Sequence, residues 1–283
     1  MALLYRPRLI ALDLDGTVID EHNSVPPETR AALYACRDAG IELTFLTGRR
    51  PRTAGPLLES IGLPAYVATN SGCLLWEYPA WRQLARRMFP AELVPELARL
   101  TEPYTVNFYL DSSQAGVEFV QLKRQSTPET ELHMARYGGN TRAVRSVAQL
   151  EGYEVTQLAL PASPEIVLPL RDRVRAELNG RVLALAVRWP LLPTLALEVF
   201  GPQSHKGAAL KYFAELLGVP QAACLAVGDD VNDVAMFHWA GYAVAMPHAQ
   251  EEVRAAADEA LKGNGARMLA AYLQHVAALP PAG

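Results

Sequence analysis

The sequence predicts an α/β fold in which a doubly wound, Rossmann-like parallel sheet is interrupted by an inserted α+β domain. Two observations predict the sheet: short apolar runs alternate with helix-like segments near both ends of the 283-residue chain, and several runs stop at polar or acidic residues. Strands buried on both faces of a parallel sheet have this continuous apolar character. A third observation, the alternating pattern of the middle of the chain, predicts the insertion.

The first part of the predicted sheet domain covers residues 1–83. Leu9–Leu12 is an apolar run that ends at Asp13, as expected of a buried strand. Segments with helical spacing, each followed by a glycine, then alternate with further apolar runs. The predicted elements are a helix at Pro27–Ala39, a strand at Ile41–Leu46, a helix at Pro51–Ile61 and a strand at Tyr66–Ala68. Strands separated by helices favour parallel pairing.

The pattern changes over residues 84–193, where polar and apolar residues alternate. Helices are predicted at Pro90–Leu100 and Pro164–Leu178. The strands predicted between and after them are Thr105–Leu110, Gly116–Leu122, Glu154–Leu160 and Val182–Trp189. Alternation of this kind indicates an antiparallel sheet, and therefore a separate α+β domain. The proline-rich stretch from Pro190 to Pro193 is the one candidate linker.

Residues 194–283 return to the first pattern and are predicted to complete the sheet domain. The elements are a strand at Leu195–Phe200, a helix at Lys206–Leu217, a strand at Cys224–Val227, a helix at Val231–Trp239 and a strand at Tyr242–Ala245. The middle domain is therefore an insertion between two halves of one α/β domain.

Composition excludes several classes of partner. The net charge is only −4 and no basic block occurs, so a nucleic-acid partner is not expected. The most apolar segment, Val182–Val199, contains Arg188 and Glu198, which argues against a membrane span. The three cysteines form no CxxC pair, which argues against a disulfide framework or a thiolate zinc site. We expect a cytoplasmic protein, monomeric by default.

Two carboxylates follow the first predicted strand. Asp13 and Asp15 are two residues apart, and the two-residue period of an extended chain directs both side chains to the same side. Two charges about 4 Å apart at an effective dielectric near 20 repel by about 4 kcal/mol, so either one carboxyl is protonated or a cation lies between them. Hard oxygen ligands favour Mg²⁺. The alternative interpretation is a turn and a helix cap, with Asp-Gly as a loop signal.

A second acidic cluster follows the predicted strand at Cys224–Val227. Asp229, Asp230 and Asp233 lie there together with Asn232, after Gly228. Carboxylates at a second strand end of the same sheet could complete a metal site. The alternative is a helix N-terminus, where Asp and Asn accept hydrogen bonds from free backbone N–H groups. Two clusters at strand ends of one sheet favour the metal site.

Thr47 and Lys206 offer the groups that bind phosphate, a hydroxyl donor and an ammonium. Alone, Thr47-Gly48-Arg49 is a weak signal, and a lysine at the start of a helix is usually solvated. In combination with the two acidic clusters, they indicate a site for a cation and a phosphate.

These segments resemble the four motifs of the haloacid dehalogenase superfamily and occur in the same order. They are Asp13-Leu14-Asp15-Gly16-Thr17, Thr47-Gly48-Arg49, Lys206, and Gly228-Asp229-Asp230-Val231-Asn232-Asp233. The Cof-type subfamily, with a type IIB cap, is the closer resemblance. It rests on Thr69-Asn70-Ser71-Gly72, on the run from Ser204 to Leu210, and on the Gly-Asp-x-x-Asn-Asp-x-x-Met pattern that ends at Met236.

The resemblance implies a Mg²⁺-dependent phosphatase that hydrolyses a small phosphorylated metabolite, such as a sugar phosphate, through a phosphoaspartate. It implies that Asp13 is the nucleophile and Asp15 the general acid and base. The implied metal ligands are Asp13, the backbone carbonyl of Asp15, and Asp229. The implied phosphate-binding residues are Thr47, Gly48, Lys206 and Asn232, with support from Asp233, Arg49 and Asn70. The inserted domain would be the cap, which closes over the site and selects the leaving group.

Two positions depart from the subfamily pattern: Ser71, where the family often carries Gly-Ala after the asparagine, and His205 beside the lysine. Both bear on substrate preference. None of the six histidines is assigned to metal, because no ligand spacing such as HExxH occurs. Two other functions stay open: a phosphotransferase or sugar phosphomutase on the same core, and a non-catalytic protein that binds a phosphorylated ligand.

Overall fold

A computed structural model describes residues 3–281, except 112–115, 138–139, 190–193 and 264–265. The candidate linker at residues 190–193 lies outside the described residues. The chain divides into two compact units, one formed by Met1–Arg86 with His205–Gly283 and the other by Arg87–Ser204. The middle domain was predicted at residues 84–193, so the structure extends it at its C-terminal end to Ser204.

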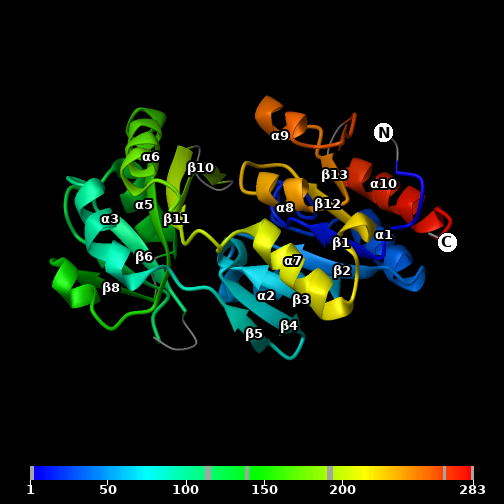
Figure 1. The fold of residues 1–283 in the computed structure, drawn as a ribbon, viewed down its shortest axis with the longest axis horizontal. Helices are drawn as coiled ribbons and strands as arrows, with labels where there is room; N and C mark the ends of the chain where they lie inside the picture. Colours follow the sequence, from blue (N-terminus) through cyan, green and yellow to red (C-terminus); the bar gives the residue numbers. More distant parts are fainter. Residues whose placement is uncertain (1–2, 112–115, 138–139, 190–193, 264–265, 282–283) are drawn as a thin grey trace. The chain divides into compact units, whose positions relative to one another are not determined.

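The first unit is built on an eight-stranded sheet (Figure 1). Its order is β14 (Glu259–Ala260), β13 (Tyr242–Ala245), β12 (Cys224–Gly228), β1 (Leu9–Leu12), β2 (Glu42–Leu46), β3 (Ala65–Thr69), β4 (Leu74–Tyr78) and β5 (Arg82–Arg86). The strands from β14 to β3 run parallel, while β4 and β5 add antiparallel pairing at one edge. The predicted α/β fold with a parallel sheet is confirmed.

Strand β1 lies at the point where the strand order reverses. The chain proceeds from β1 to β2 and β3 on one side, and β12 and β13 lie on the other side. In the parallel register, Leu12 is opposite both Val227 of β12 and Phe45 of β2. The residues that follow these three strands therefore emerge at the same edge of the sheet, where α/β proteins bind ligands.

Six α-helices belong to this unit among the described residues: α1 (Pro27–Asp38), α2 (Pro51–Ile61), α7 (Lys206–Leu217), α8 (Val234–Trp239), α9 (Glu251–Ala255) and α10 (Ala266–Ala278). Helices α7 and α8 supply Leu210, Phe213 and Met236 to an apolar cluster with the sheet. Helix α1 packs on α10, where Cys36 Sγ donates to the Leu273 carbonyl at 3.4 Å. Strands β4, β5 and β14 and helices α9 and α10 were not predicted from the sequence.

The second unit contains a six-stranded sheet in the order β10 (Leu183–Trp189), β11 (Thr194–Phe200), β9 (Val155–Ala162), β6 (Val106–Leu110), β7 (Phe119–Leu122) and β8 (Thr141–Val144). All neighbours are antiparallel except β7 and β8. The longer helices of this unit are α3 (Val94–Leu100), α5 (Pro128–Tyr137) and α6 (Pro164–Leu178). Leu97, Val167 and Val174 of α3 and α6 pack into its apolar core.

The assignment of Leu195–Phe200 to the sheet domain was wrong. Strand β11 pairs with β9 and β10 in the second unit, with Glu198 opposite both Ala159 and Leu185. An apolar run predicts a strand but does not identify its partner, because pairing depends on tertiary packing.

Among the described residues, every helix is too short or too polar to cross a membrane.

Candidate functional site

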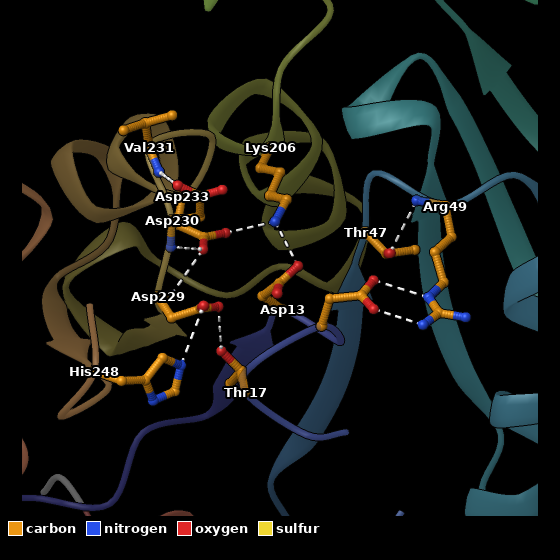
Figure 2. A network of polar contacts seen from close by, with 11 residues as sticks. Asp13, Thr17, Thr47, Arg49, Lys206, Asp229, Asp230, Val231, Asp233 and His248 are labelled. Atoms are coloured by element: carbon orange, nitrogen blue, oxygen red, sulfur yellow. Dashed lines mark hydrogen bonds and ion pairs between the residues drawn. The ribbon is translucent and has the colours of Figure 1, made fainter. Parts of the chain in front are cut away.

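Asp13 is the first residue after β1 and is almost fully buried, with 5% of its surface exposed. Its backbone N–H donates to the Val227 carbonyl of β12 at 3.0 Å, which continues the sheet pairing by one residue. Its carboxylate accepts a hydrogen bond from Lys206 Nζ at 2.5 Å (Figure 2). Burial raises the pKa of the Asp13 carboxyl well above its usual value, and Lys206 offsets only part of this effect. The ionised form therefore needs further positive charge.

Lys206 is the first residue of α7, and 1% of its surface is exposed. His205 precedes it as the N-cap, and its Nδ1 accepts a hydrogen bond from the Ala208 N–H at 3.1 Å. Lys206 Nζ donates to both Asp13 Oδ1 and Asp233 Oδ1 at 2.5 Å. Burial alone would lower the lysine pKa, but attraction to the two carboxylates outweighs it and raises the pKa. Lys206 is therefore a fixed cation.

Asp233 organises the loop that follows β12. Its Oδ2 accepts hydrogen bonds from the N–H groups of Asp229 at 2.9 Å and Asp230 at 3.0 Å, while its Oδ1 accepts from Lys206. Burial raises the pKa of its carboxyl, with Lys206 opposing the shift. The side chain thus links the loop to the first turn of α7. The loop from Asp229 to Asp233 is not helical, so α8 begins at Val234 and not at the predicted Val231.

Asp229 is held by side chains from two other segments (Figure 2). Thr17 Oγ1 donates to its Oδ1 at 3.1 Å, and His248 Nε2 lies 3.2 Å from its Oδ2. Gly16 has a φ of +74°, and a Cβ at this position would lie 2.3 Å from Asp229 Oδ2. Only glycine fits between the two strand ends there, because any side chain would displace the carboxylate.

Asp13, Asp229 and Asp233 form a cluster in which one oxygen of each lies within 4.8 Å of the others. At an effective dielectric near 20, two charges at that distance repel by roughly 3.5 kcal/mol. Lys206 supplies one positive charge to three carboxylates, so the cluster has an excess of negative charge. Carboxylate oxygens in this number and spacing fit a hard divalent cation such as Mg²⁺.

The Asp15 carboxylate does not belong to this cluster. It accepts two hydrogen bonds from Arg49, from Nε at 2.8 Å and from Nη2 at 2.5 Å. Arg49 Nη2 also donates to Asn23 Oδ1 at 2.5 Å. Two parallel hydrogen bonds fix the orientation of a carboxylate more firmly than one. Arg49 was predicted to support the site, but its pairing with Asp15 was not predicted.

Thr47 follows β2 and is fully buried. Its Oγ1 accepts a hydrogen bond from the Arg49 N–H at 3.0 Å, which leaves its own hydrogen to donate to a ligand. The turn at Asn70–Gly72 lies beside this loop, because the Ser71 N–H donates to the Thr47 carbonyl at 2.9 Å. Asn232 Nδ2 lies 3.9 Å from the position that a Cβ on Gly48 would take. The predicted site residues of the first unit thus surround one edge of the sheet.

The contact of His248 with Asp229 was not predicted, since no histidine was expected at the metal site. Its hydrogen bond to Asp229 raises the pKa of the imidazole, while partial burial acts in the opposite direction. No local spacing reveals this residue, because it is nineteen positions from Asp229. The signal is topological: β13 pairs in parallel with β12, so the loop after β13 reaches the same edge of the sheet.

Comparison with known proteins gives one family for nearly the whole chain. The family model of haloacid dehalogenase-like hydrolases matches residues 10–273. The chain is 26% identical to an HMP-PP phosphatase of Serratia proteamaculans, over 87% of this chain and 86% of the relative. It is also 26% identical to a 5-amino-6-(5-phospho-D-ribitylamino)uracil phosphatase of Bacillus subtilis, YcsE, over 89% of this chain and 88% of the relative.

A solved structure supports the fold. The structure of a haloacid dehalogenase-like hydrolase from B. subtilis matches with a TM-score of 0.77 and 22% identity, covering 95% of this chain and 99% of the other. The likeness therefore extends over both compact units, each of which has its counterpart in a chain of similar length.

Proposed function

Because the chain belongs to the haloacid dehalogenase-like hydrolase family, we propose that it is a Mg²⁺-dependent phosphatase that hydrolyses a small phosphorylated metabolite through a phosphoaspartate on Asp13. The family and the phosphatase class expected from the sequence are confirmed by its relatives. The metal, the intermediate and the roles of individual residues are our proposal.

The observation that carries this proposal is the charge arrangement around Asp13. The buried Asp13 carboxylate, whose pKa is raised, shares the ammonium of Lys206 with Asp233 and has oxygens of Asp229 and Asp233 within 4.8 Å. A stable fold does not require this excess of negative charge, because unpaired buried charges are costly. It is suited to a site that becomes neutral when a divalent cation is bound. Asp13 and Asp229, with the Asp15 carbonyl, would hold the ion, and Asp233 would support them.

The cation would neutralise charge on the phosphoryl oxygens, so that an anionic nucleophile can approach an anionic substrate. The residues of the chain position the reacting groups. Lys206 fixes the orientation of Asp13 through Oδ1 at 2.5 Å, which leaves Oδ2 to attack phosphorus. Thr47 offers a hydroxyl hydrogen, and Asn232 and the backbone of Gly48 line the same space. Fixed donors of this kind stabilise the charge that develops in the transition state.

Asp15 is proposed as the general acid and base. In the first step its carboxyl proton passes to the leaving oxygen, and in the second its carboxylate removes a proton from the water that hydrolyses the phosphoaspartate. In its ionised form this carboxyl group accepts both hydrogen bonds from Arg49, which fixes the direction of the base. The acid form carries its proton on one of these oxygens, and that oxygen gives up its hydrogen bond from Arg49. Arg49 acts through Asp15 and is therefore a positioning residue.

The test is the release of phosphate from a chromogenic phosphate ester. We expect release that depends on Mg²⁺ and is abolished by Asp13→Asn, with circular dichroism showing that the variant is folded. Turnover retained in Asp13→Asn would refute the proposal. Transfer of the phosphoryl group to an added sugar, in place of water, would identify a phosphotransferase on the same core.

The substrate class follows from the relatives named above, which act on small phosphorylated molecules. We propose a phosphomonoester of that size, such as a sugar phosphate, and selection of the leaving group by the inserted unit at Arg87–Ser204. A cytoplasmic location and a monomeric state remain predictions from the sequence.

A further inference from the structure

Ser71 has a backbone conformation that residues other than glycine rarely adopt. It lies in the turn at Asn70–Gly72 after β3, with φ 55° and ψ 26° in the left-handed region. Glycine occupies this region without strain, whereas serine is destabilised there by contact of its Cβ with the backbone. Strained residues of this kind persist where the surrounding structure fixes them, and they cluster at functional sites. The strain alone identifies no ligand, but the position of the side chain does.

The turn is held between two parts of the proposed phosphate site. On one side, the Ser71 N–H donates to the Thr47 carbonyl at 2.9 Å. On the other, Gly72 lies so close to the start of α7 that a Cβ there would be 2.6 Å from the His205 carbonyl oxygen. Ser71 therefore lies between the Thr47 loop and the residue that precedes Lys206.

The Ser71 hydroxyl has no hydrogen-bond partner among the residues that the structure describes. The residue is 2% exposed, and its Oγ is a buried polar atom without a donor or acceptor in the described part of the chain. Buried polar atoms are nearly always hydrogen-bonded, so a group without a partner indicates a missing ligand or water.

The side chains of Ser71 and Asn232 flank the same space. A Cβ placed on Gly48 would lie 3.4 Å from Ser71 Oγ and 3.9 Å from Asn232 Nδ2. Gly48 directly follows Thr47, whose hydroxyl hydrogen is available to a ligand. A serine hydroxyl, a threonine hydroxyl and an amide N–H around one glycine form a set of donors, and donors in this number suit the oxygens of a tetrahedral oxyanion.

We propose that the Ser71 hydroxyl binds an oxygen of the phosphoryl group together with Thr47 and Asn232, and is a further substrate-binding residue. The inference rests on the proposed phosphatase function. The hydroxyl donates its hydrogen to the phosphoryl oxygen and makes no covalent bond.

The test measures the binding of inorganic phosphate in the presence of Mg²⁺ by calorimetry, with Ser71→Ala and Ser71→Gly. Both variants lack the hydroxyl, but alanine keeps the strained backbone and glycine relieves it. We expect each to bind phosphate about tenfold more weakly, which corresponds to about 1.4 kcal/mol. We also expect Ser71→Gly to melt at or above the temperature of the wild type.

The control is Ser60→Ala on α2, where the hydroxyl bonds the Leu57 carbonyl of its own helix. It should bind phosphate as the wild type does. Wild-type affinity in either Ser71 variant, with an active wild-type enzyme, would overturn this inference and leave the phosphatase proposal standing. That result would mean that an ordered water, and not the phosphate, binds the Ser71 hydroxyl. A wild type that neither binds phosphate nor hydrolyses an ester would overturn both.

Discussion

Lys206→Met is the substitution that most directly probes the buried charges of this site. The methionine side chain fills a similar volume but carries no ammonium. Lys206 Nζ donates to Asp13 and Asp233 at 2.5 Å each, and all three residues are at least 95% buried. The variant therefore leaves two buried carboxylates, with Asp229 nearby, and no cation.

Loss of one partner from a buried ion pair costs about 3–5 kcal/mol, because the remaining charge is neither solvated nor compensated. Native proteins are stable by about 5–15 kcal/mol, so this is a large fraction of the total. For proteins of about 150–250 residues, each kcal/mol corresponds to about 2–4 °C, and the melting temperature should fall by roughly 6–20 °C. Mg²⁺ should restore more stability to the variant than it adds to the wild type.

The assay is thermal unfolding followed by circular dichroism, in a chelator and in Mg²⁺. Lys211→Met is the matched control, since this lysine lies on the same helix, is largely exposed and is 3.9 Å from Glu215. An exposed pair of this kind contributes less than about 1 kcal/mol. If Lys206→Met melts at the temperature of Lys211→Met in the chelator, the charge argument for the site is wrong.

Three further predictions concern single residues. Asp15→Asn should lower turnover of a chromogenic ester about 10²–10⁴-fold while inorganic phosphate still binds by calorimetry, and normal turnover would exclude Asp15 as the acid. His248→Ala removes one of two side chains that hold Asp229, so the Mn²⁺ affinity measured by electron paramagnetic resonance should fall about tenfold; unchanged affinity would assign His248 no role in orienting the ligand. Burial raises the pKa of the Cys36 thiol from 9.0 to about 12, so an aromatic disulfide reagent should leave Cys36 unmodified at pH 8 in the native protein. Because the raised pKa favours the folded state only while the thiol is protonated, this contribution is complete below pH 9 and is lost as the pH rises through about 12, which denaturant titrations with Cys36→Ser as reference would detect.

Much of the site could be predicted from local patterns. An apolar run that stops at Asp13, and another that stops before Asp229, identify strand ends without any knowledge of the partner strands. The reversal of strand order at β1 then brings these ends together, as the motif order implied.

Features that depend on tertiary pairing could not be predicted. The run at 195–200 is as apolar as a core strand, yet β11 pairs in the second unit. The contact of His248 with Asp229 and the bidentate contact of Arg49 with Asp15 join segments whose spacing carries no signal. The lack of a hydrogen-bond partner for the Ser71 hydroxyl among the described residues was likewise visible only in the structure, although Ser71 departs from the subfamily pattern in the sequence.

The most direct test of the proposed chemistry is to locate the phosphoryl group on the chain. A chromogenic ester labelled in its phosphate, whose leaving group departs without protonation, would be mixed with the Asp15→Asn variant and Mg²⁺, quenched in acid and digested. We expect the label on the peptide that contains Asp13, because the variant forms the acyl phosphate but hydrolyses it slowly. Label on another peptide, or rapid turnover by a variant that lacks the Asp13 carboxylate, would contradict the account.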